Sequence, residues 1–360
     1  MSAETRVYSF FNNKGGVGKT TLCQNVACLY AENNPTKQVL VIDLCPQANI
    51  SQFLMGGGHV GYEKNQKLQA HSTLKNIVGF IDWLLKGNSG FSTIKTSYKV
   101  CVAEHNEQIA DNLYLIAGDS FLESFSLALN YAVLNPANKH AWKEYMTAIH
   151  RLCECEFDSH EYDSLTVFID CNPSFSIYTQ MALVSSDFLV TPMMADFSSL
   201  EGVKATLMLL YGKYPSAALK KYADDIVTFN AKIEESGLPL PKFWEFIFNN
   251  FTPHAGVAKA FDAVRNELVE FCYTQFQTSP ELFAAYNGAI DSQVAWESVF
   301  VSKTKDFHTA GKVSSSLGIP LHKLPQQNKY DMPNGEPVNL PEGNYKECLQ
   351  HIHALVNKIT

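Results

Sequence analysis

The stretch NNKGGVGKTTL, from Asn12 to Leu22, constrains this chain more than any other. It follows a short apolar run, RVYSFF, and its Lys-Thr-Thr end opens a helical pattern. Gly15, Gly16 and Gly18 let the backbone curl so that its N–H groups face one point, and the helix adds its positive end. This order of strand, glycine-rich turn and helix predicts a phosphate-binding loop.

Within this loop, Lys19 is expected to reach the β- and γ-phosphates of a nucleotide, and the Thr20 hydroxyl to bind Mg²⁺. The residues expected to surround the phosphates are Lys14, Gly15, Gly16, Val17, Gly18, Lys19, Thr20 and Thr21. The loop departs from the pattern GxxxxGK[ST], because Asn13 replaces the first glycine and Lys14 follows it. A second lysine here indicates either a further anion or a solvated loop.

Charge and composition favour a cytoplasmic protein. The 360 residues carry a net charge of −8, which argues against a surface coated in positive charge for nucleic acid. Nine cysteines without a spacing pattern indicate reduced thiols. The chain enters its first strand at once, and its longest apolar run is too short to span a bilayer. We therefore expect no signal peptide and no membrane association.

Short apolar, β-rich runs alternate with helical patterns along the chain, which predicts an α/β fold with a doubly wound, mostly parallel sheet. The expected strands are residues 6–11, 39–42, 113–116, 166–169, 188–191, 243–248 and 298–301. Several runs end in a polar residue, namely Asn12, Asp43, Asp170 and Asn249. Because ligands bind at the carboxyl ends of such strands, these residues are candidates for the site.

We expect one domain over residues 1–360, with helical insertions near 56–111, 215–241 and 258–292. The second insertion reads as one helix, and the third as two helices separated by Thr-Ser-Pro. Residues 320–341 contain five prolines and read as an extended loop. A final amphipathic helix is expected over residues 344–359.

Five segments, in order, carry a resemblance to a known family. They are KGGVGKTT, VLVIDLCPQANIS, TVFIDCNPSF, FLVTPMMADFSSLEGV and, more loosely, VFVSKTKDF with GKVSSSLGIPL. Together they frame about two thirds of the chain and resemble the ParA/MinD (Soj-like) family of deviant Walker A ATPases, closest to the ParA partition ATPases. The resemblance implies a P-loop NTPase fold of the SIMIBI type.

The resemblance also implies roles for single residues. Lys14 would reach across a nucleotide-sandwich dimer to the partner's phosphates, and Lys19 would be the ordinary P-loop lysine. Asp170 and Asp43, with Thr20, would form the Mg²⁺ site, so that Lys14, Lys19, Asp43 and Asp170 are the expected catalytic residues. Asn249 matches an adenine-reading asparagine, although asparagine at a strand end is also a common turn residue. Asn250 is the next candidate for that role.

Cys45 stands where the family's DxDPQ motif has its second aspartate, which helps to orient the attacking water. A thiol is mostly neutral and accepts hydrogen bonds weakly, so one interpretation is a slow ATPase. A second is a redox switch, in which nearby lysines lower the pKa of the thiol. A third is that Cys45 only fills space.

The family resemblance implies an ATP-dependent homodimer that acts as a switch for plasmid or chromosome partition, or for cargo positioning. Hydrolysis would be stimulated by a ParB-like or adaptor protein, and the ATP state would bind non-specific DNA at the nucleoid. Residues 201–330 hold thirteen basic and thirteen acidic residues. The best local basic patch there is formed by Lys303, Lys305 and Lys312, followed by the pair Lys220 and Lys221, and each is also consistent with a solvated loop.

Three alternatives differ in class. One is a MinD-like site-placement ATPase on a membrane or a protein scaffold, for which the C-terminal helix would be the anchor. That helix has only Lys346 and Lys358 as basic residues, so we expect it to pack on its own core. An iron–sulfur reductase would need a glycine-flanked cysteine partner for Cys171, and none is found. A signalling or defence ATPase with a protein partner stays open.

Overall fold

The computed structural model describes residues 4–70, 74–87, 97–135, 138–249, 258–304, 307–332 and 335–359. An eight-stranded sheet lies at the centre, in the order β3-β4-β2-β5-β1-β6-β7-β8. The β3–β4 pair is antiparallel, and the other neighbours pair in parallel. Its strands are β1 (Thr5–Phe10), β2 (Lys37–Leu44), β3 (Val100–Cys101), β4 (Leu113–Ile116), β5 (Ser164–Cys171), β6 (Phe188–Met193), β7 (Lys242–Phe248) and β8 (Val301–Lys303).

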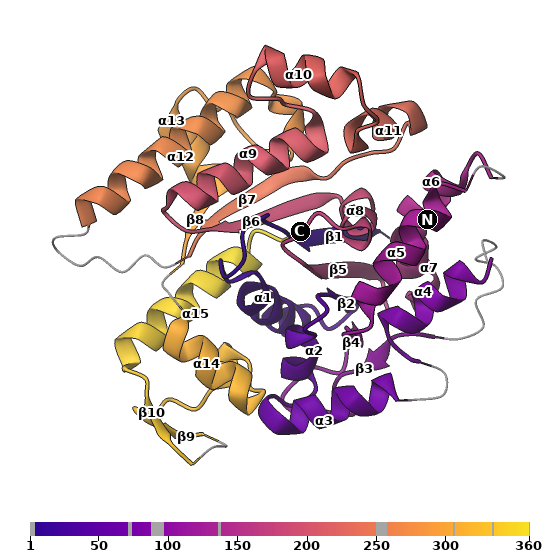
Figure 1. Cartoon of the computed structure of the whole chain (residues 1–360). Coiled ribbons are helices and arrows are strands. Elements are labelled where there is room, and N and C mark those ends of the chain that lie inside the picture. The colour runs from indigo at the N-terminus through magenta and orange to yellow at the C-terminus, as the bar shows by residue number, and fades with distance from the viewer. Residues whose placement is uncertain are drawn as a thin grey trace.

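Helices cover both faces of this sheet, as Figure 1 shows. The helices of the N-terminal part are α1 (Lys19–Asn33), α2 (Asn49–Leu54), α3 (Gly58–Gln69), α4 (Ile77–Leu85), α5 (Leu122–Val133), α6 (Ala141–Met146), α7 (Ala148–Glu156) and α8 (Ile177–Val184). Those that follow are α9 (Phe197–Tyr211), α10 (Ala217–Asp224), α11 (Phe229–Ser236), α12 (Ala258–Thr278), α13 (Gln293–Phe300), α14 (His308–Leu317) and α15 (Glu342–Val356).

The central strands are buried on both sides because their side chains alternate between two hydrophobic cores. In β2, Leu40 and Ile42 belong to the core under α4, α5 and α8, whereas Val39 and Val41 belong to the core under α1 and α15. All four side chains are fully buried. The predicted α/β fold with a doubly wound, mostly parallel sheet is therefore confirmed.

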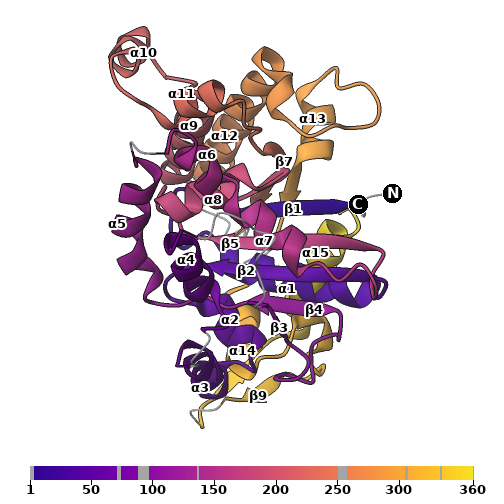
Figure 2. The same cartoon turned by 90° about the vertical axis from the view of Figure 1, so that its right-hand side faces the viewer.

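The strand order brings together the polar residues at the carboxyl ends of β1, β5 and β2, which are Asn12, Asp170 and Asp43. β5 lies between β1 and β2, so Asp170 is in register with Phe10 on one side and with Asp43 on the other. Figure 2 shows the three strands side by side. The carboxyl edge of β1, β5 and β2 therefore positions the candidate site.

Two of the expected elements are wrong near the C-terminal half of the sheet. Residues 298–300 are the end of helix α13, and strand β8 begins only at Val301. The helix forms because the Ser292 side chain accepts a hydrogen bond from the Ala295 amide, and Trp296 and Phe300 then bury one helical face. The segment 215–241 holds two helices, α10 and α11, each started by its own cap, Ser216 and Thr228.

The third insertion also differs from expectation. α12 ends at Thr278, as the Thr-Ser-Pro sequence predicts, but only one 3-10 turn, Pro280–Leu282, follows before α13. The first insertion contains α3, α4 and the short strand β3, which was not predicted.

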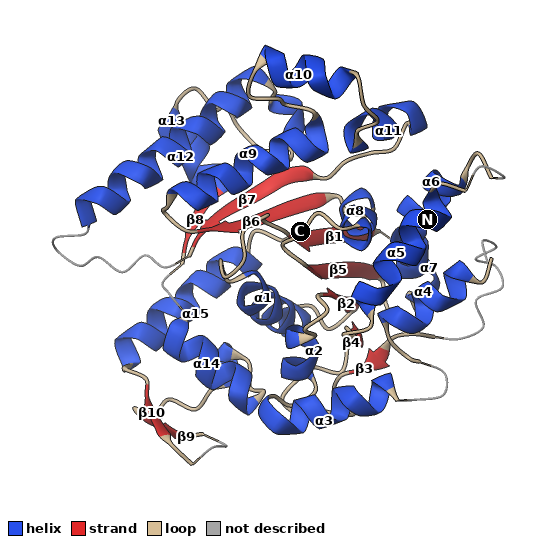
Figure 3. Cartoon of the chain, in the orientation of Figure 1, coloured by secondary structure: helices blue, strands red, loops and turns tan. Residues whose placement is uncertain are grey.

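The proline-rich segment 320–341 is not simply extended. It contains a 3-10 turn, Leu321–Lys323, and the strands β9 (Lys329–Asp331) and β10 (Pro337–Asn339). These two strands pair in antiparallel fashion, and Figure 3 shows the resulting ribbon apart from the main sheet. Backbone pairing across a turn at Gly335, which has a φ of 81°, overrides the local preference of proline for an extended chain.

The C-terminal helix α15 starts two residues earlier than expected, at Glu342, and ends at Val356. Its apolar face is buried in the same core as α1, which confirms the expected packing on the protein's own core. The residues of that face are Tyr345, Cys348, Ile352, Leu355 and Val356. No helix in the described part of the chain is both long and apolar enough to cross a membrane.

Candidate nucleotide site

The loop between β1 and α1 forms an open backbone cradle. Gly16 and Gly18 have φ values of 73° and 85°, which other residues rarely adopt. A Cβ atom at Gly18 would lie 2.1 Å from the Asn249 side-chain nitrogen, so a side chain there would displace Asn249 from the loop. Among the described residues, no side chain caps the start of α1, which leaves its first amides to face an anion.

Lys19 closes this loop from the inside. Its ammonium donates hydrogen bonds to the carbonyl oxygens of Asn12, at 3.2 Å, and Lys14, at 2.8 Å. Burial lowers the pKa of Lys19, against the opposing effect of the Asp170 carboxylate. A buried cation that joins the two ends of the cradle can place positive charge on a bound phosphate.

Thr20 and Asp170 meet beneath the loop. The Thr20 hydroxyl donates to Asp170 Oδ2 at 2.7 Å. The other oxygen, Oδ1, is buried and has no hydrogen-bond partner among the described residues. Burial, followed by the charge of Asp43, raises the pKa of Asp170 to about 7. An orphaned carboxylate oxygen beside a hydroxyl is a donor set that Mg²⁺ accepts, so these residues fit the cation.

Asp43 lies beside Asp170, but it accepts its hydrogen bonds from Cys45 and Ser51 and not from Thr20. Oδ1 accepts from the Cys45 amide at 2.9 Å, and Oδ2 accepts from the Ser51 amide at 3.1 Å and hydroxyl at 2.6 Å. Burial raises the pKa of Asp43 to about 6, although these hydrogen bonds oppose the shift. Asp43 therefore fixes the turn that carries Cys45, and its expected role as a Mg²⁺ ligand stays a prediction.

Asp43, Ser51 and Gly118 together form a wall beside the phosphate loop. Sequence reasoning missed the last two residues of this wall. The Gly118 amide donates to the Ser51 hydroxyl at 2.8 Å. A Cβ atom at Gly118 would lie 2.7 Å from Cγ of Asp43, so only glycine allows the approach. Ser51 ends the segment VLVIDLCPQANIS but was given no role there, and no motif marks Gly118. The importance of both comes from where the fold brings them.

Cys45 is half-buried next to Asp43. Burial, followed by the Asp43 charge, raises the pKa of its thiol to about 12. The redox interpretation required lysines to lower this pKa, and that premise is wrong because Lys19 contributes only a small opposing effect. A protonated thiol remains, which is consistent with the interpretations of a slow ATPase and of a space-filling residue.

Lys14 does not join Lys19 in the cradle. Its amide donates to Asn12 Oδ1 at 2.9 Å, but its ammonium forms an ion pair with Asp196 and lies 4.0 Å from the Met194 sulfur. Asp196 also caps α9 by accepting from the Ser199 amide at 2.8 Å. Sequence reasoning missed Asp196 as a partner for Lys14, although an aspartate before a helical pattern is a recognisable cap.

Asn249 lies against the cradle. Its side-chain nitrogen donates to the Val17 carbonyl at 3.1 Å, and its side-chain oxygen accepts from the Thr304 hydroxyl at 3.4 Å. The side chain is thus at the phosphate loop, while its role in reading adenine stays a prediction. Asn250, the other candidate, lies outside the described residues.

A hydrogen-bonded chain connects the loop after β5 to α5. The Asn172 side-chain nitrogen donates to the Tyr178 hydroxyl at 3.2 Å, and that hydroxyl donates to the Glu123 carboxylate at 2.9 Å. Tyr178 is fully buried, so its hydroxyl group depends on these partners. The chain holds the backbone that follows Asp170.

The basic residues proposed for DNA are placed only in part. Lys303 ends β8 and Lys312 lies in α14, and both are exposed, whereas Lys305 lies outside the described residues. Lys220 and Lys221 are exposed on α10.

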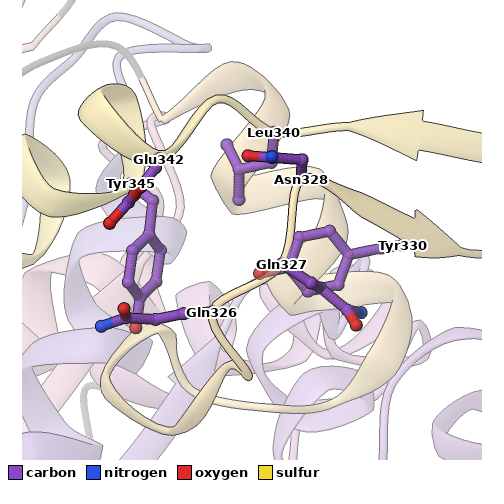
Figure 4. A pocket seen from close by; sticks show the side chains of 7 residues that line it. All are labelled: Gln326, Gln327, Asn328, Tyr330, Leu340, Glu342 and Tyr345. Atoms are coloured by element: carbon purple, nitrogen blue, oxygen red, sulfur yellow. The ribbon is translucent and has the colours of Figure 1, made fainter.

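Two hollows differ in their relation to the cradle. A cleft of about 360 Å³ borders the start of α1 and is lined by neutral polar side chains, including Thr20, Thr21, Gln24, Asn49 and Gln52. A pocket of about 150 Å³ lies near β9, β10 and α15, and Figure 4 shows the side chains that line it. Its lining residues all lie between 326 and 345, so this pocket is separate from the phosphate loop. The Tyr345 and Tyr330 hydroxyls there donate to backbone carbonyls.

Comparison with known proteins decides the family. A family model described as an AAA domain matches residues 5–212, more than half of the chain. The chain belongs to this family, among the ParA/MinD P-loop ATPases. An uncharacterized protein of Pseudomonas putida is 29% identical over 198 residues, which are 55% of this chain and 59% of that protein. The sporulation initiation inhibitor protein Soj of Bacillus subtilis is 25% identical over 202 residues, which are 56% of this chain and 63% of Soj.

The chain thus spans less than two thirds of the length of either of these two relatives. Among solved structures, a plasmid partition protein of Borrelia burgdorferi bound to AMPPNP is 20% identical and aligns over 99% of this chain and 100% of its own, with a TM-score of 0.51. The pNOB8 ParA bound to nonspecific DNA is 14% identical over 99% and 100% of the two chains, with a TM-score of 0.52. At these identities the likeness shows the shared fold.

Proposed function

We propose that this chain is a ParA-like ATPase in which ATP binding drives a nucleotide-sandwich dimer. The observation that carries the proposal is the pair of lysines in one glycine-rich loop. Lys19 is buried inside the cradle, whereas Lys14 leaves the cradle and pairs with a carboxylate outside it. A second ammonium that does not serve its own loop is suited to the phosphates of a partner subunit.

The residues beneath the loop support binding of ATP together with Mg²⁺. Thr20 and Asp170 would hold the cation, with Asp43 next to them in register. When bound, the cation supplies positive charge that offsets the charge of the phosphates. The fully buried Asp170 must be ionised to serve this role; burial and the charge of Asp43 raise its pKa, and a bound cation would lower it.

Slow hydrolysis is the expected behaviour of this site. Phosphoryl transfer depends on positioning and electrostatics, and a residue that orients the attacking water is part of both. Cys45 carries a protonated thiol where the family has an aspartate, so it orients a water molecule weakly. A protein partner that supplies or orders the missing group would then set the rate.

The output of the switch would be partition of a plasmid or chromosome, or positioning of a cargo. A relative by fold is bound to nonspecific DNA, and Lys303, Lys305 and Lys312 are the residues that we assign to that contact here. Salt-sensitive binding of the ATP state to random duplex DNA would support this role, and no binding at low salt would contradict it. The membrane alternative gains nothing from α15, because its apolar face is buried.

Complementation between two inactive variants tests the proposal. A Lys14→Ala subunit keeps its own ATP-binding lysine, Lys19, but has no ammonium for its partner's phosphates. A Lys19→Ala subunit keeps Lys14 for its partner but has lost the lysine of its own loop. Each variant alone should hydrolyse ATP poorly, and their mixture should recover turnover because one complete site forms across the dimer. A mixture no faster than the sum of its parts would contradict the proposal.

A further inference from the structure

Lys14 is held in a defined position in the single subunit. Its ammonium pairs with Asp196 Oδ2 and its backbone amide with Asn12 Oδ1. The contact between this loop and α9 is close, since a Cβ atom at Gly202 would lie 2.5 Å from Asn12 Oδ1 and 3.8 Å from Lys14 Cβ. The start of α9 is therefore packed directly against the part of the loop that carries Lys14.

Asp196 is fixed independently of Lys14. Its other oxygen, Oδ1, accepts from the Ser199 amide at 2.8 Å, which caps α9. The Ser199 hydroxyl in turn accepts from the Met194 amide at 2.9 Å, so the turn is tied at both ends. Although burial acts in the opposite direction, the hydrogen bonds from Lys14 and Ser199 lower the pKa of Asp196, which is therefore ionised at neutral pH. Its carboxylate cannot follow Lys14 when the lysine moves.

A single ammonium cannot satisfy Asp196 and a partner's phosphates at the same time. The two side chains are 21% and 39% exposed, so the pair can open without unfolding its surroundings. Breaking such a partly exposed ion pair costs little free energy, whereas the ammonium gains more by binding to the multiple charges of a triphosphate. The balance between the two acceptors then depends on whether a nucleotide-loaded partner is present.

We propose that Asp196 is a latch that holds Lys14 on its own subunit and thereby raises the threshold for dimer closure. Release of the latch requires a competing anion, so a subunit without a nucleotide-loaded partner stays single. The inference rests on the proposed function of Lys14 and adds to it a residue that controls when that function is used.

The test uses the conservative variant Asp196→Asn. Asparagine keeps the cap on α9 through its side-chain oxygen but cannot form the ion pair. At saturating ATP, the dimer dissociation constant, measured by sedimentation over a range of protein concentrations, should fall roughly tenfold, with the melting temperature unchanged. The matched control is Glu201→Gln, which breaks the exposed pair of Glu201 with Lys204 on the same helix and should leave the dimer unchanged.

The effect must also depend on Lys14. In the Lys14→Ala background, Asp196→Asn should not restore ATP-dependent dimerisation, because the latch has nothing to hold. Wild type that dimerises with ATP while Asp196→Asn has the same or a weaker affinity would overturn the latch and leave the proposed function intact. Failure of both proteins to dimerise would overturn both, and a dimer seen with Asp196→Asn but not with wild type would support the latch.

Discussion

The phosphate loop and the wall that faces it are held by different kinds of contact. The loop from Asn12 to Thr20 is closed by its own Lys19, which bonds to the carbonyls of Asn12 and Lys14. Its contacts to Asp170, Asp196 and Asn249 add to this closure. The wall is assembled from separate segments, because Asp43 depends on Ser51 and on the close approach of Gly118. The closure of the loop by Lys19 should survive substitutions in neighbouring segments. The wall should be disturbed by a substitution at any of its members, because they come from separate segments.

The largest effect is expected in the loop. Lys19→Ala removes the ammonium that joins the two ends of the cradle, so ATP affinity should fall roughly 100-fold or more, as for loss of two charge-assisted hydrogen bonds. Fluorescent-nucleotide titration measures this change. Lys204→Ala, which changes a half-buried lysine of α9, is the control and should bind ATP as wild type does. Equal ATP affinities of the two variants would show that Lys19 does not contribute to ATP binding.

The second prediction concerns chemistry at the wall. Cys45→Asp restores a carboxylate that can orient water, so turnover at saturating ATP should rise by on the order of 10²-fold while ATP affinity stays the same. Phosphate release and nucleotide titration separate the two quantities. Cys155→Asp, which changes an exposed cysteine of α7, is the control. An unchanged or lower rate in Cys45→Asp would favour the space-filling interpretation of this cysteine.

The third prediction tests how tightly the wall is packed. Gly118→Ala places a methyl group 2.7 Å from the carboxylate carbon of Asp43, so the free energy of unfolding should fall by about 1–3 kcal/mol. Urea denaturation measures it. Gly343→Ala adds the same methyl group where no described atom lies within 4 Å, and it should leave stability nearly unchanged. Similar stabilities for the two variants would show that the wall is looser than described.

The smallest effect is expected for the buried charge. The pKa of Asp170 is about 7, above its unfolded value, so its contribution to stability is complete below pH 4 and is lost as the pH rises through about 7. Asp170→Asn should therefore stabilise the nucleotide-free protein by about 1 kcal/mol at pH 8, and less at pH 5, while weakening Mg²⁺-dependent nucleotide binding. Thermal melts at both pH values check this, with the exposed Asp82→Asn as control. A loss of stability at pH 8 would contradict it.

The same contrast explains what the sequence could predict. The loop, its preceding strand and its following helix are contiguous, so glycine spacing and apolar runs were enough to locate Lys14, Lys19 and Thr20. The sheet was also predictable, because strands such as β2 are buried on both faces and read as apolar runs. Asp196 as the partner of Lys14, and Gly118 as the neighbour of Asp43, depend on contacts between distant segments and could not be read from spacing.

The prediction of secondary structure failed in two segments for a related reason. The sequence at residues 298–301 has strand-like composition, yet the Ser292 cap and the burial of Trp296 and Phe300 at helical spacing make residues 298–300 the end of α13. Likewise, the proline-rich segment forms the β9–β10 ribbon because its two halves pair with each other. In both cases a tertiary or capping contact outweighs local preference.

The central claim is that Lys14 acts on a partner subunit. Size-exclusion chromatography with light scattering, on wild type and Lys14→Ala with and without Mg²⁺ and ATP, tests it most directly. Wild type should be a single subunit without nucleotide and a dimer with ATP, and Lys14→Ala should form no ATP-dependent dimer. A wild-type protein whose mass does not change with ATP, or a Lys14→Ala variant that dimerises as wild type does, would contradict it.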